Sequence, residues 1–172
     1  MAIGLQGRRM GKTRDEEMVR AASVVIADGS QFGRRLTRTM LVSLGVRSIT
    51  EVADGPSALE AVSSSRPDVL ITDWDLPILS GIDVIKRIRS PESFPYPDVP
   101  ILMLTMRTER RHVLKALGHG ANEFLAKPTS TLAIRDRVIS ALAKRRPMVR
   151  LGEYYVPTPR AWPPKGSQPE LL

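Results

Sequence analysis

Short hydrophobic runs alternate with amphipathic segments along most of the chain. Most runs have hydrophobic residues at consecutive positions, a pattern typical of strands buried on both faces of a parallel sheet. Strands are therefore expected at residues 23–27, 48–52, 68–73, 100–105 and 123–126. The intervening segments have hydrophobic residues at helical spacing, which predicts helices at 31–44, from 56 onward, and at 81–89, 107–117 and 132–144.

Local signals support several of these helices. Pro56 stands at the start of the second helix, where its missing N–H costs nothing. Gly45 and Gly118 are expected to end the first and the fourth helix. Candidate core residues are Phe32, Leu36, Met40 and Leu44 in the first helix, Leu59 and Val62 in the second, and Leu132, Val138, Ala141 and Leu142 in the last.

The strict alternation of strands and helices predicts an α/β fold. We expect a doubly wound five-stranded parallel sheet with helices on both faces, in the flavodoxin-like (βα)5 arrangement, over residues 23–146. Residues 1–22 form a basic N-terminal extension, with a short helix from about Asp15. Residues 147–172 are a proline-rich C-terminal tail, whose aromatic residues Tyr154, Tyr155 and Trp162 would anchor it on a partner or on its own domain.

Composition and charge narrow the class of protein. The 172 residues are 42% hydrophobic and 26% charged, as in ordinary globular proteins. No run reaches the ~20 apolar residues of a membrane span, and the N-terminus lacks the apolar stretch of a secretory signal, so a cytoplasmic protein without membrane contact is expected. The absence of cysteine excludes disulfides and thiolate metal sites. The net charge of +8 is compatible with nucleic-acid binding, but no nucleic-acid-binding motif accompanies it, and this partner is disfavoured.

Four polar residues stand where predicted strands end: Asp28, Asp73, Thr105 and Lys127. Ligands of doubly wound sheets bind at the carboxyl ends of the strands, so these side chains are expected to converge. Two neighbouring carboxylates repel each other, and Mg²⁺, which takes oxygen ligands, would remove that repulsion. The lysine and threonine would then contact an anion that the metal also binds. This layout suits phosphoryl transfer to a carboxylate.

Five segments, in this order and spacing, resemble the response-regulator receiver family, best known from chemotaxis response regulators. They are VVIAD (24–28), DVLITD (68–73), DWDLPILSG (73–81), ILMLT (101–105) and GANEFLAKP (120–128). The resemblance implies that Asp73 is the phosphoryl acceptor and that Lys127 pairs with the phosphoryl group. It also implies that Thr105 is a switch hydroxyl, coupled to a rotating aromatic side chain at Phe124.

The resemblance also implies a Mg²⁺ site, formed by Asp28, Asp73 and the backbone carbonyl of Asp75. Gly29, however, stands where the family usually has a second acid, typically the direct metal ligand, so weak Mg²⁺ binding is expected. The side chain of Asp75 would either support the cation or pair with Arg107.

Two further neighbours of the site are expected to modulate it. Pro128 matches a cis proline of the family that directs Lys127 into the site. Met106 stands where the family usually has a small residue. Its side chain would either shield an acyl phosphate from water or pack elsewhere.

The implied function is that of a single-domain response regulator, not an enzyme. It would accept a phosphoryl group from a sensor histidine kinase or a histidine phosphotransfer protein, then signal to a downstream protein, to a second copy in a homodimer, or through a phosphorelay. A basic face with Arg110, Arg111, Lys115 and Arg135 would bind that partner. Two alternatives remain: a pseudo-receiver that acts as a phosphorylation-independent scaffold, and a basic nucleic-acid-binding regulator.

Overall fold

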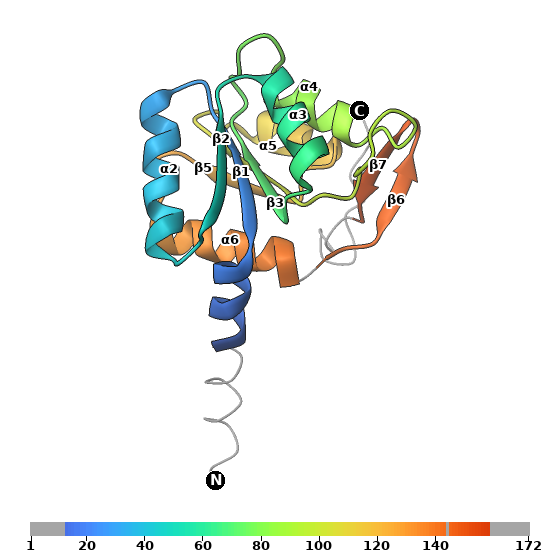
Figure 1. The fold of residues 1–172 in the computed structure, drawn as a ribbon. Coiled ribbons are helices and arrows are strands. Elements are labelled where there is room, and N and C mark those ends of the chain that lie inside the picture. Colours follow the sequence, from blue (N-terminus) through green and yellow to red (C-terminus); the bar gives the residue numbers. More distant parts are fainter. Residues whose placement is uncertain (1–12, 144, 159–172) are drawn as a thin grey trace.

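A five-stranded parallel sheet forms the centre of the molecule (Figure 1). The computed structural model describes residues 13–143 and 145–158. The strands are β1 (Ser23–Ala27), β2 (Ser48–Val52), β3 (Val69–Thr72), β4 (Ile101–Thr105) and β5 (Glu123–Ala126), in the order β2-β1-β3-β4-β5. The helices between and after them are α2 (Gln31–Ser43), α3 (Gly55–Ser65), α4 (Gly81–Ile88), α5 (Arg110–Gly118) and α6 (Thr131–Ala143). The predicted α/β class and flavodoxin-like strand order are confirmed.

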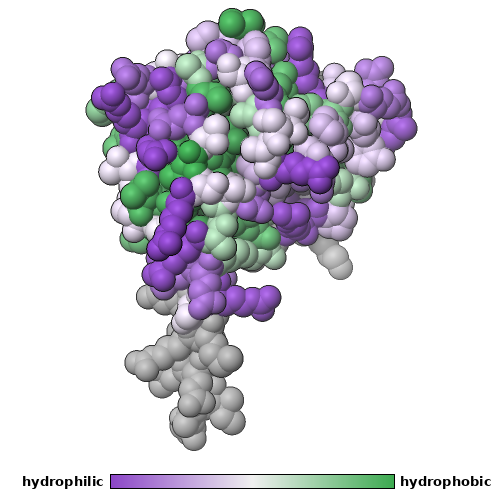
Figure 2. All heavy atoms as spheres, in the orientation of Figure 1, coloured by the Kyte–Doolittle hydropathy of each residue, from purple (hydrophilic) through white to green (hydrophobic). Residues whose placement is uncertain are grey.

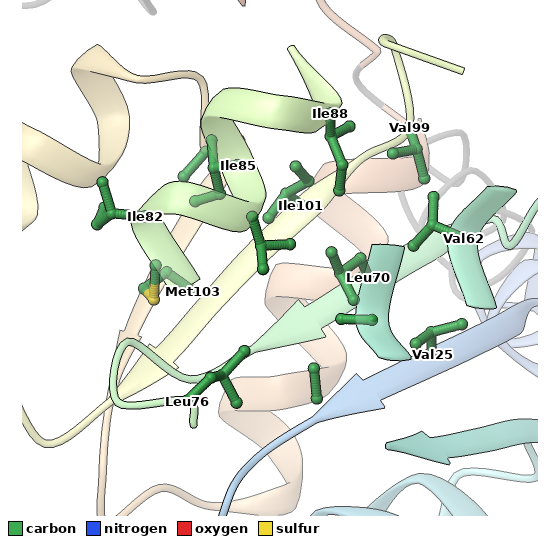
Figure 3. Packing of buried hydrophobic residues seen from close by; sticks show 14 of the residues in the cluster. Val25, Val62, Leu70, Leu76, Ile82, Ile85, Ile88, Val99, Ile101 and Met103 are labelled. Atoms are coloured by element: carbon green, nitrogen blue, oxygen red, sulfur yellow. The ribbon is translucent and has the colours of Figure 1, made fainter. Parts of the chain in front are cut away.

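Two hydrophobic clusters pack against opposite faces of the sheet. One includes residues of α3, α4 and α5 (Figure 3), and the other includes residues of α2 and α6. All residues of β3 and β4 are buried, because these strands have helices on both faces. This agrees with their unbroken hydrophobic sequence.

The predicted buried stripe of α2 is partly correct. Met40 and Leu44 pack half-buried against the cluster shared with α6, whereas Phe32 and Leu36 are exposed. The buried residues are Thr37 and Leu41, which lie on the neighbouring stripe, since both stripes repeat every fourth residue. A threonine in this stripe conceals its position in the sequence.

Smaller differences occur in the last two helices. Leu132 is exposed, whereas Val138 and Ala141 are buried as predicted, together with Ile134. Gly118 lies within α5, and the left-handed residue after the helix is Gly120, with φ 109°. At α3, by contrast, Asp54 caps the N-terminus by accepting a hydrogen bond from the Ser57 amide, and proline occupies the first turn as predicted.

The end of the predicted N-terminal extension packs onto the domain. Residues 13–21 are helical, and Val19 and Ala22 are buried in the cluster shared with α2 and α6. The packed body therefore begins before residue 23.

The predicted tail contains a β-hairpin. β6 (Met148–Leu151) and β7 (Tyr154–Pro157) pair antiparallel through a turn in which Gly152 has φ 62°. Val156 is buried, and the Tyr155 amide donates a hydrogen bond to the carbonyl of Arg89 (2.7 Å). Residues 1–12 and 159–172 lie outside the described residues. The predicted anchoring by Trp162 falls in the second of these ranges.

A fully buried arginine joins the hairpin to the sheet. Arg89 donates to the carbonyls of Gly120 and Pro97 and to the side-chain oxygen of Asn122. That oxygen also accepts from the Ile101 amide at the start of β4. Burial lowers the pKa of Arg89 to about 9, so the side chain stays charged at neutral pH and depends on these acceptors.

The surface is mixed in character (Figure 2). Hydrophilic residues cover much of α2 and the outer part of the N-terminal helix, with smaller hydrophobic areas between them. None of the helices among the described residues combines the length and apolar character that a membrane crossing requires.

Candidate functional site

Four polar residues meet at the carboxyl edge of the sheet. Asp28 follows β1, Asp73 follows β3, Thr105 ends β4 and Lys127 follows β5. β1 and β3 are neighbours at the point where the strand order reverses, so the two aspartates are adjacent.

The ammonium group of Lys127 bridges both carboxylates. Its Nζ lies 2.6 Å from Oδ2 of Asp28 and 2.6 Å from Oδ2 of Asp73. These two aspartate side chains are 6% and 12% exposed, which makes the ion pairs far less screened than those on the surface. Burial acts to lower the pKa of Lys127, but the hydrogen bonds and charges of Asp28 and Asp73 outweigh it and hold that pKa above its ordinary value.

Backbone amides orient the carboxylate of Asp73. Its Oδ1 accepts hydrogen bonds from the amides of Trp74 (2.5 Å) and Asp75 (3.3 Å), which leaves Oδ2 for Lys127. The loop returns to start α4 at Gly81, whose amide donates to the Trp74 carbonyl. A Cβ at position 81 would lie 2.0 Å from the Asp73 carbonyl oxygen, so this close approach requires glycine.

Asp28 is held by the N-terminus of α2. Its Oδ1 accepts from the Ser30 amide (2.8 Å), and its backbone carbonyl accepts from Nη1 of Arg34 (2.6 Å). A Cβ on Gly33 would come within 2.4 Å of Oδ2, so glycine lets the carboxylate lie against the helix. The sequence analysis missed Ser30, Gly33 and Arg34. The signal was present, since an N-capping serine follows an aspartate by two residues.

The side chain of Asp75 pairs with Arg107. The guanidinium donates from Nε to both carboxylate oxygens (3.0 Å each) and from Nη2 to Oδ1 (2.8 Å). The hydrogen bond and charge of Asp75 raise the pKa of Arg107, to which the charge of Asp73 also contributes. Of the two expected roles of the Asp75 side chain, the structure shows the ion pair.

The remaining predicted site residues are found as follows. Thr105 is buried, its hydroxyl accepts from the Arg107 amide (3.2 Å), and its carbonyl accepts from the Lys127 amide. Phe124 is half-buried and packs against the cluster of α3, α4 and α5. Met106 is 67% exposed and is not part of the core. The Lys127–Pro128 peptide bond is cis, as the resemblance implied.

The oxygen atoms of the cleft suit a hard divalent cation. A Cβ at Gly29 would lie 3.4 Å from the carbonyl oxygen of Asp75, so this oxygen lies close to the residue that follows Asp28. With the carboxylates of Asp28 and Asp73 it forms a set of oxygen donors of the kind that Mg²⁺ prefers. Gly29 adds no side-chain ligand. Within the described residues no cluster of three or more acidic, histidine or cysteine side chains suits a metal ion. The residues therefore fit Mg²⁺ with two carboxylates and one carbonyl, together with water.

The fold and this cleft define a receiver domain. The chain belongs to the response regulator receiver domain family, whose profile matches residues 24–139. Among known proteins it is similar to the chemotaxis protein CheY of Pseudomonas aeruginosa, with 30% identity over 115 residues, 67% of this chain and 91% of that protein. It is also 30% identical to CheY1 of Helicobacter pylori over 116 residues, which cover 67% of this chain and 92% of that protein.

Solved structures agree with this assignment. The receiver domain of a sensor histidine kinase from Pseudomonas aeruginosa, with a magnesium ion coordinated in its active site cleft, is similar with a TM-score of 0.64 and 26% identity. The match covers 71% of this chain and 98% of that receiver domain. The chemotaxis protein CheY4 of Vibrio cholerae has a TM-score of 0.59 and 28% identity, covering 72% and 98% of the two chains.

Proposed function

We propose that the chain is a phosphorylatable switch and that Asp73 accepts the phosphoryl group. The observation that carries this proposal is the convergence of Asp73, Asp28 and Lys127 within hydrogen-bonding distance in a largely buried cleft. An ammonium held beside the acceptor would neutralise charge on the incoming phosphoryl oxygens, which is the main task in phosphoryl transfer.

The proposed step moves a phosphoryl group from a phosphohistidine to Asp73. A bond forms between a carboxylate oxygen and phosphorus while the phosphorus–nitrogen bond breaks. The imidazole nitrogen keeps the electron pair and takes up a proton. The product is an acyl phosphate on the protein itself, so the chain acts as an acceptor and not as an enzyme with a released product.

Asp28, Asp73 and the carbonyl of Asp75 would hold Mg²⁺ in this reaction. When bound, the ion would neutralise charge shared by the acceptor and the phosphoryl oxygens. Because Gly29 supplies no carboxylate, Lys127 carries a larger share of the charge neutralisation in this cleft than it would beside a third acid.

The response would begin at Thr105 and Lys127. A phosphoryl group carries about −1.5 to −2 charges and strong acceptor oxygens, so both residues gain a partner that exists only in the modified state. Phe124 lies on β5, which pairs with β4, the strand that ends at Thr105. Its half-buried packing suits an aromatic side chain coupled to Thr105. This would bias the surface of α5, β5 and α6 between two states.

The edge of the sheet around Asp73 suits a phosphodonor protein. Large hydrophobic residues are exposed after four strands that end there: Phe32, Ile78, Met106 and Leu132. Ile78 also has φ 71°, a left-handed conformation that is unfavourable for a β-branched residue. These features favour docking of a sensor histidine kinase or a histidine phosphotransfer protein at this edge.

A different face would carry the output. Arg110, Arg111 and Lys115 are exposed on α5, and the exposed Leu114 and Leu117 share that helix. Arg135 on α6 is partly buried and pairs with Asp136. Such a basic, partly hydrophobic face suits an acidic downstream protein, or an acidic surface of a second copy of this chain.

The decisive experiment is phosphotransfer to the purified chain. A phosphorylated histidine kinase, or phosphoramidate as a small donor, is incubated with the chain and Mg²⁺, and the acyl phosphate is detected by intact mass. We expect one phosphoryl group on the wild type and none on Asp73→Asn. A wild type that stays unmodified with every donor would refute the proposal.

One observation favours a second candidate, a pseudo-receiver that works as a scaffold. Lys127 already satisfies both carboxylates, and Gly29 removes an expected metal ligand. In that case partner binding would be the same for the wild type and Asp73→Asn, with or without a phosphodonor. A partner affinity that depends on the donor excludes this candidate.

A further inference from the structure

The Asp75–Arg107 ion pair joins two loops that follow neighbouring strands at the acceptor site. Asp75 belongs to the loop after β3 and Arg107 to the loop after β4, and three hydrogen bonds of 2.8–3.0 Å join their side chains. The two side chains are 58% and 45% exposed. They are thus more accessible than the ion pairs of Lys127 with Asp28 and Asp73.

Each partner of this pair is also bonded to the site through its backbone. The Asp75 amide donates to Oδ1 of Asp73 (3.3 Å), and the Arg107 amide donates to Oγ1 of Thr105 (3.2 Å). The ion pair therefore links the loop of the acceptor to the loop of the predicted switch hydroxyl. The Asp75 end of the pair is bonded to the acceptor itself, and the Arg107 end to the predicted switch hydroxyl.

Phosphorylation would unbalance this arrangement electrostatically. The phosphoryl group would bring about −1.5 to −2 charges next to the carboxylate of Asp75. Lys127 already binds both Asp28 and Asp73, and residue 29 has no side chain. A guanidinium binds phosphoryl oxygens in a planar, bidentate geometry, and the higher charge of a phosphoryl group favours it over a carboxylate.

We propose that Arg107 exchanges partners, leaving Asp75 and binding the phosphoryl group on Asp73. Asp75 thereby competes with the phosphoryl group for Arg107 and restrains the reaction in the unmodified state. The exchange separates the loops after β3 and β4, so it also transmits the modification away from the cleft. This inference rests on the proposed acceptor function of Asp73.

A purely structural ion pair predicts a different outcome. If the pair only holds the two loops together, removing either partner has the same consequence. If the partners exchange, removing Arg107 takes away a ligand of the phosphoryl group, whereas removing the charge of Asp75 releases that ligand. The two substitutions then act in opposite directions.

The test uses Arg107→Ala and the isosteric Asp75→Asn in the full chain, with phosphoramidate as donor. Rates of acyl phosphate formation are followed by intact mass, and its decay is followed after donor removal. We expect Arg107→Ala to slow formation and shorten the lifetime by about fivefold or more, the lower range of coupling between sites. Asp75→Asn should accelerate formation.

A matched control is the Arg38–Glu51 pair, whose arginine side chain is also 45% exposed. Arg38→Ala and Glu51→Gln should leave both rates unchanged. Shifts of the same sign in Arg107→Ala and Asp75→Asn, or changes no larger than in the control pair, would overturn the exchange while leaving acceptor function intact. If the wild type forms no acyl phosphate, the proposed function fails and the exchange with it.

Discussion

The charge balance of the cleft depends on what stands at position 29. Two carboxylates share one ammonium, which leaves the group formed by Asp28, Asp73 and Lys127 with one net negative charge. The Asp75 carbonyl oxygen would lie 3.4 Å from a Cβ at position 29. A third acid at this position would increase both the repulsion inside the cleft and the attraction for a divalent cation.

We therefore expect Gly29→Asp to bind Mg²⁺ more tightly, by about tenfold or more. No left-handed φ is found at Gly29, and an added Cβ would be 3.1 Å from Cδ of Pro77, so a shift of a few tenths of an ångström accommodates it. Without Mg²⁺ the variant should melt at a lower temperature than the wild type, and Mg²⁺ should reverse this difference because it binds the folded state.

Magnesium affinity can be followed through Trp74, whose amide is bonded to Asp73, after Trp162→Phe removes the other tryptophan. Gly29→Ala is the control, since it adds the Cβ without the charge. Equal Mg²⁺ affinities in the Asp and Ala variants would show that charge at this position does not govern the metal site.

Some features of the site could be predicted from the sequence and others could not. Asp28, Asp73, Thr105 and Lys127 were predictable because parallel strands place their carboxyl ends at one edge. Of the contacts of Asp28 with α2, the bond from the Ser30 amide had a local signal, whereas the bond from Arg34 depends on how the helix is placed after β1. The pairing of Asp75 had two alternatives in the sequence, and only the relative position of two loops decides between them.

At the scale of elements, α2 shows why periodicity alone does not locate the most buried positions of a helix. Two neighbouring stripes repeat every fourth residue, and the more hydrophobic one is exposed at Phe32 and Leu36. We expect Leu41→Ala to lower the free energy of unfolding by about 2–5 kcal/mol, as for other fully buried leucines. Phe32→Ala should change it by no more than about 0.5 kcal/mol. Urea unfolding measures both.

Phe32→Ala should instead affect the docking of a phosphodonor protein. Transfer from a histidine kinase is expected to slow, whereas phosphorylation by phosphoramidate should stay at the wild-type rate. A variant that loses stability as Leu41→Ala does would place Phe32 in the core, against the structure.

The C-terminal hairpin shows a second limit of the sequence. Its prolines indicated an irregular tail, but Pro157 ends β7 and Pro147 precedes β6, positions where a proline does not interrupt the pairing. Burial does not alternate along either four-residue strand, so no period of two marks them in the sequence. The docking of β7 on Arg89 depends on a contact far away in the sequence.

We expect this hairpin to contribute to stability. Val156→Asp would bury an unpaired charge and should lower the free energy of unfolding by about 2 kcal/mol or more. Leu151→Asp, at a position that is 53% exposed in the paired strand, is the matched control and should change it by no more than about 0.5 kcal/mol. Equal melting temperatures of the two variants would mean that the hairpin does not dock.

For the molecule as a whole, many basic side chains of the described residues have acidic or buried partners. Several basic side chains are compensated by nearby acids, including the pairs Arg38–Glu51, Arg111–Glu109, Arg135–Asp136 and Arg137–Glu123. Others, such as Arg89 and Lys127, donate hydrogen bonds to groups inside the protein. These contacts weaken the positive field at the surfaces that carry them.

We accordingly expect only weak, non-specific binding to duplex DNA. At physiological salt the dissociation constant should be no tighter than about 1 µM, the upper limit of typical non-specific affinity. Fluorescence anisotropy across a salt series measures both the affinity and its slope. Because Arg111 already pairs with Glu109, Arg110→Gln with Arg111→Gln should reduce this affinity only slightly, although the same double variant removes two charges from the proposed output face. Nanomolar binding with a steep salt dependence, abolished by that double variant, would instead make α5 a nucleic-acid-binding helix and the receiver domain its regulator.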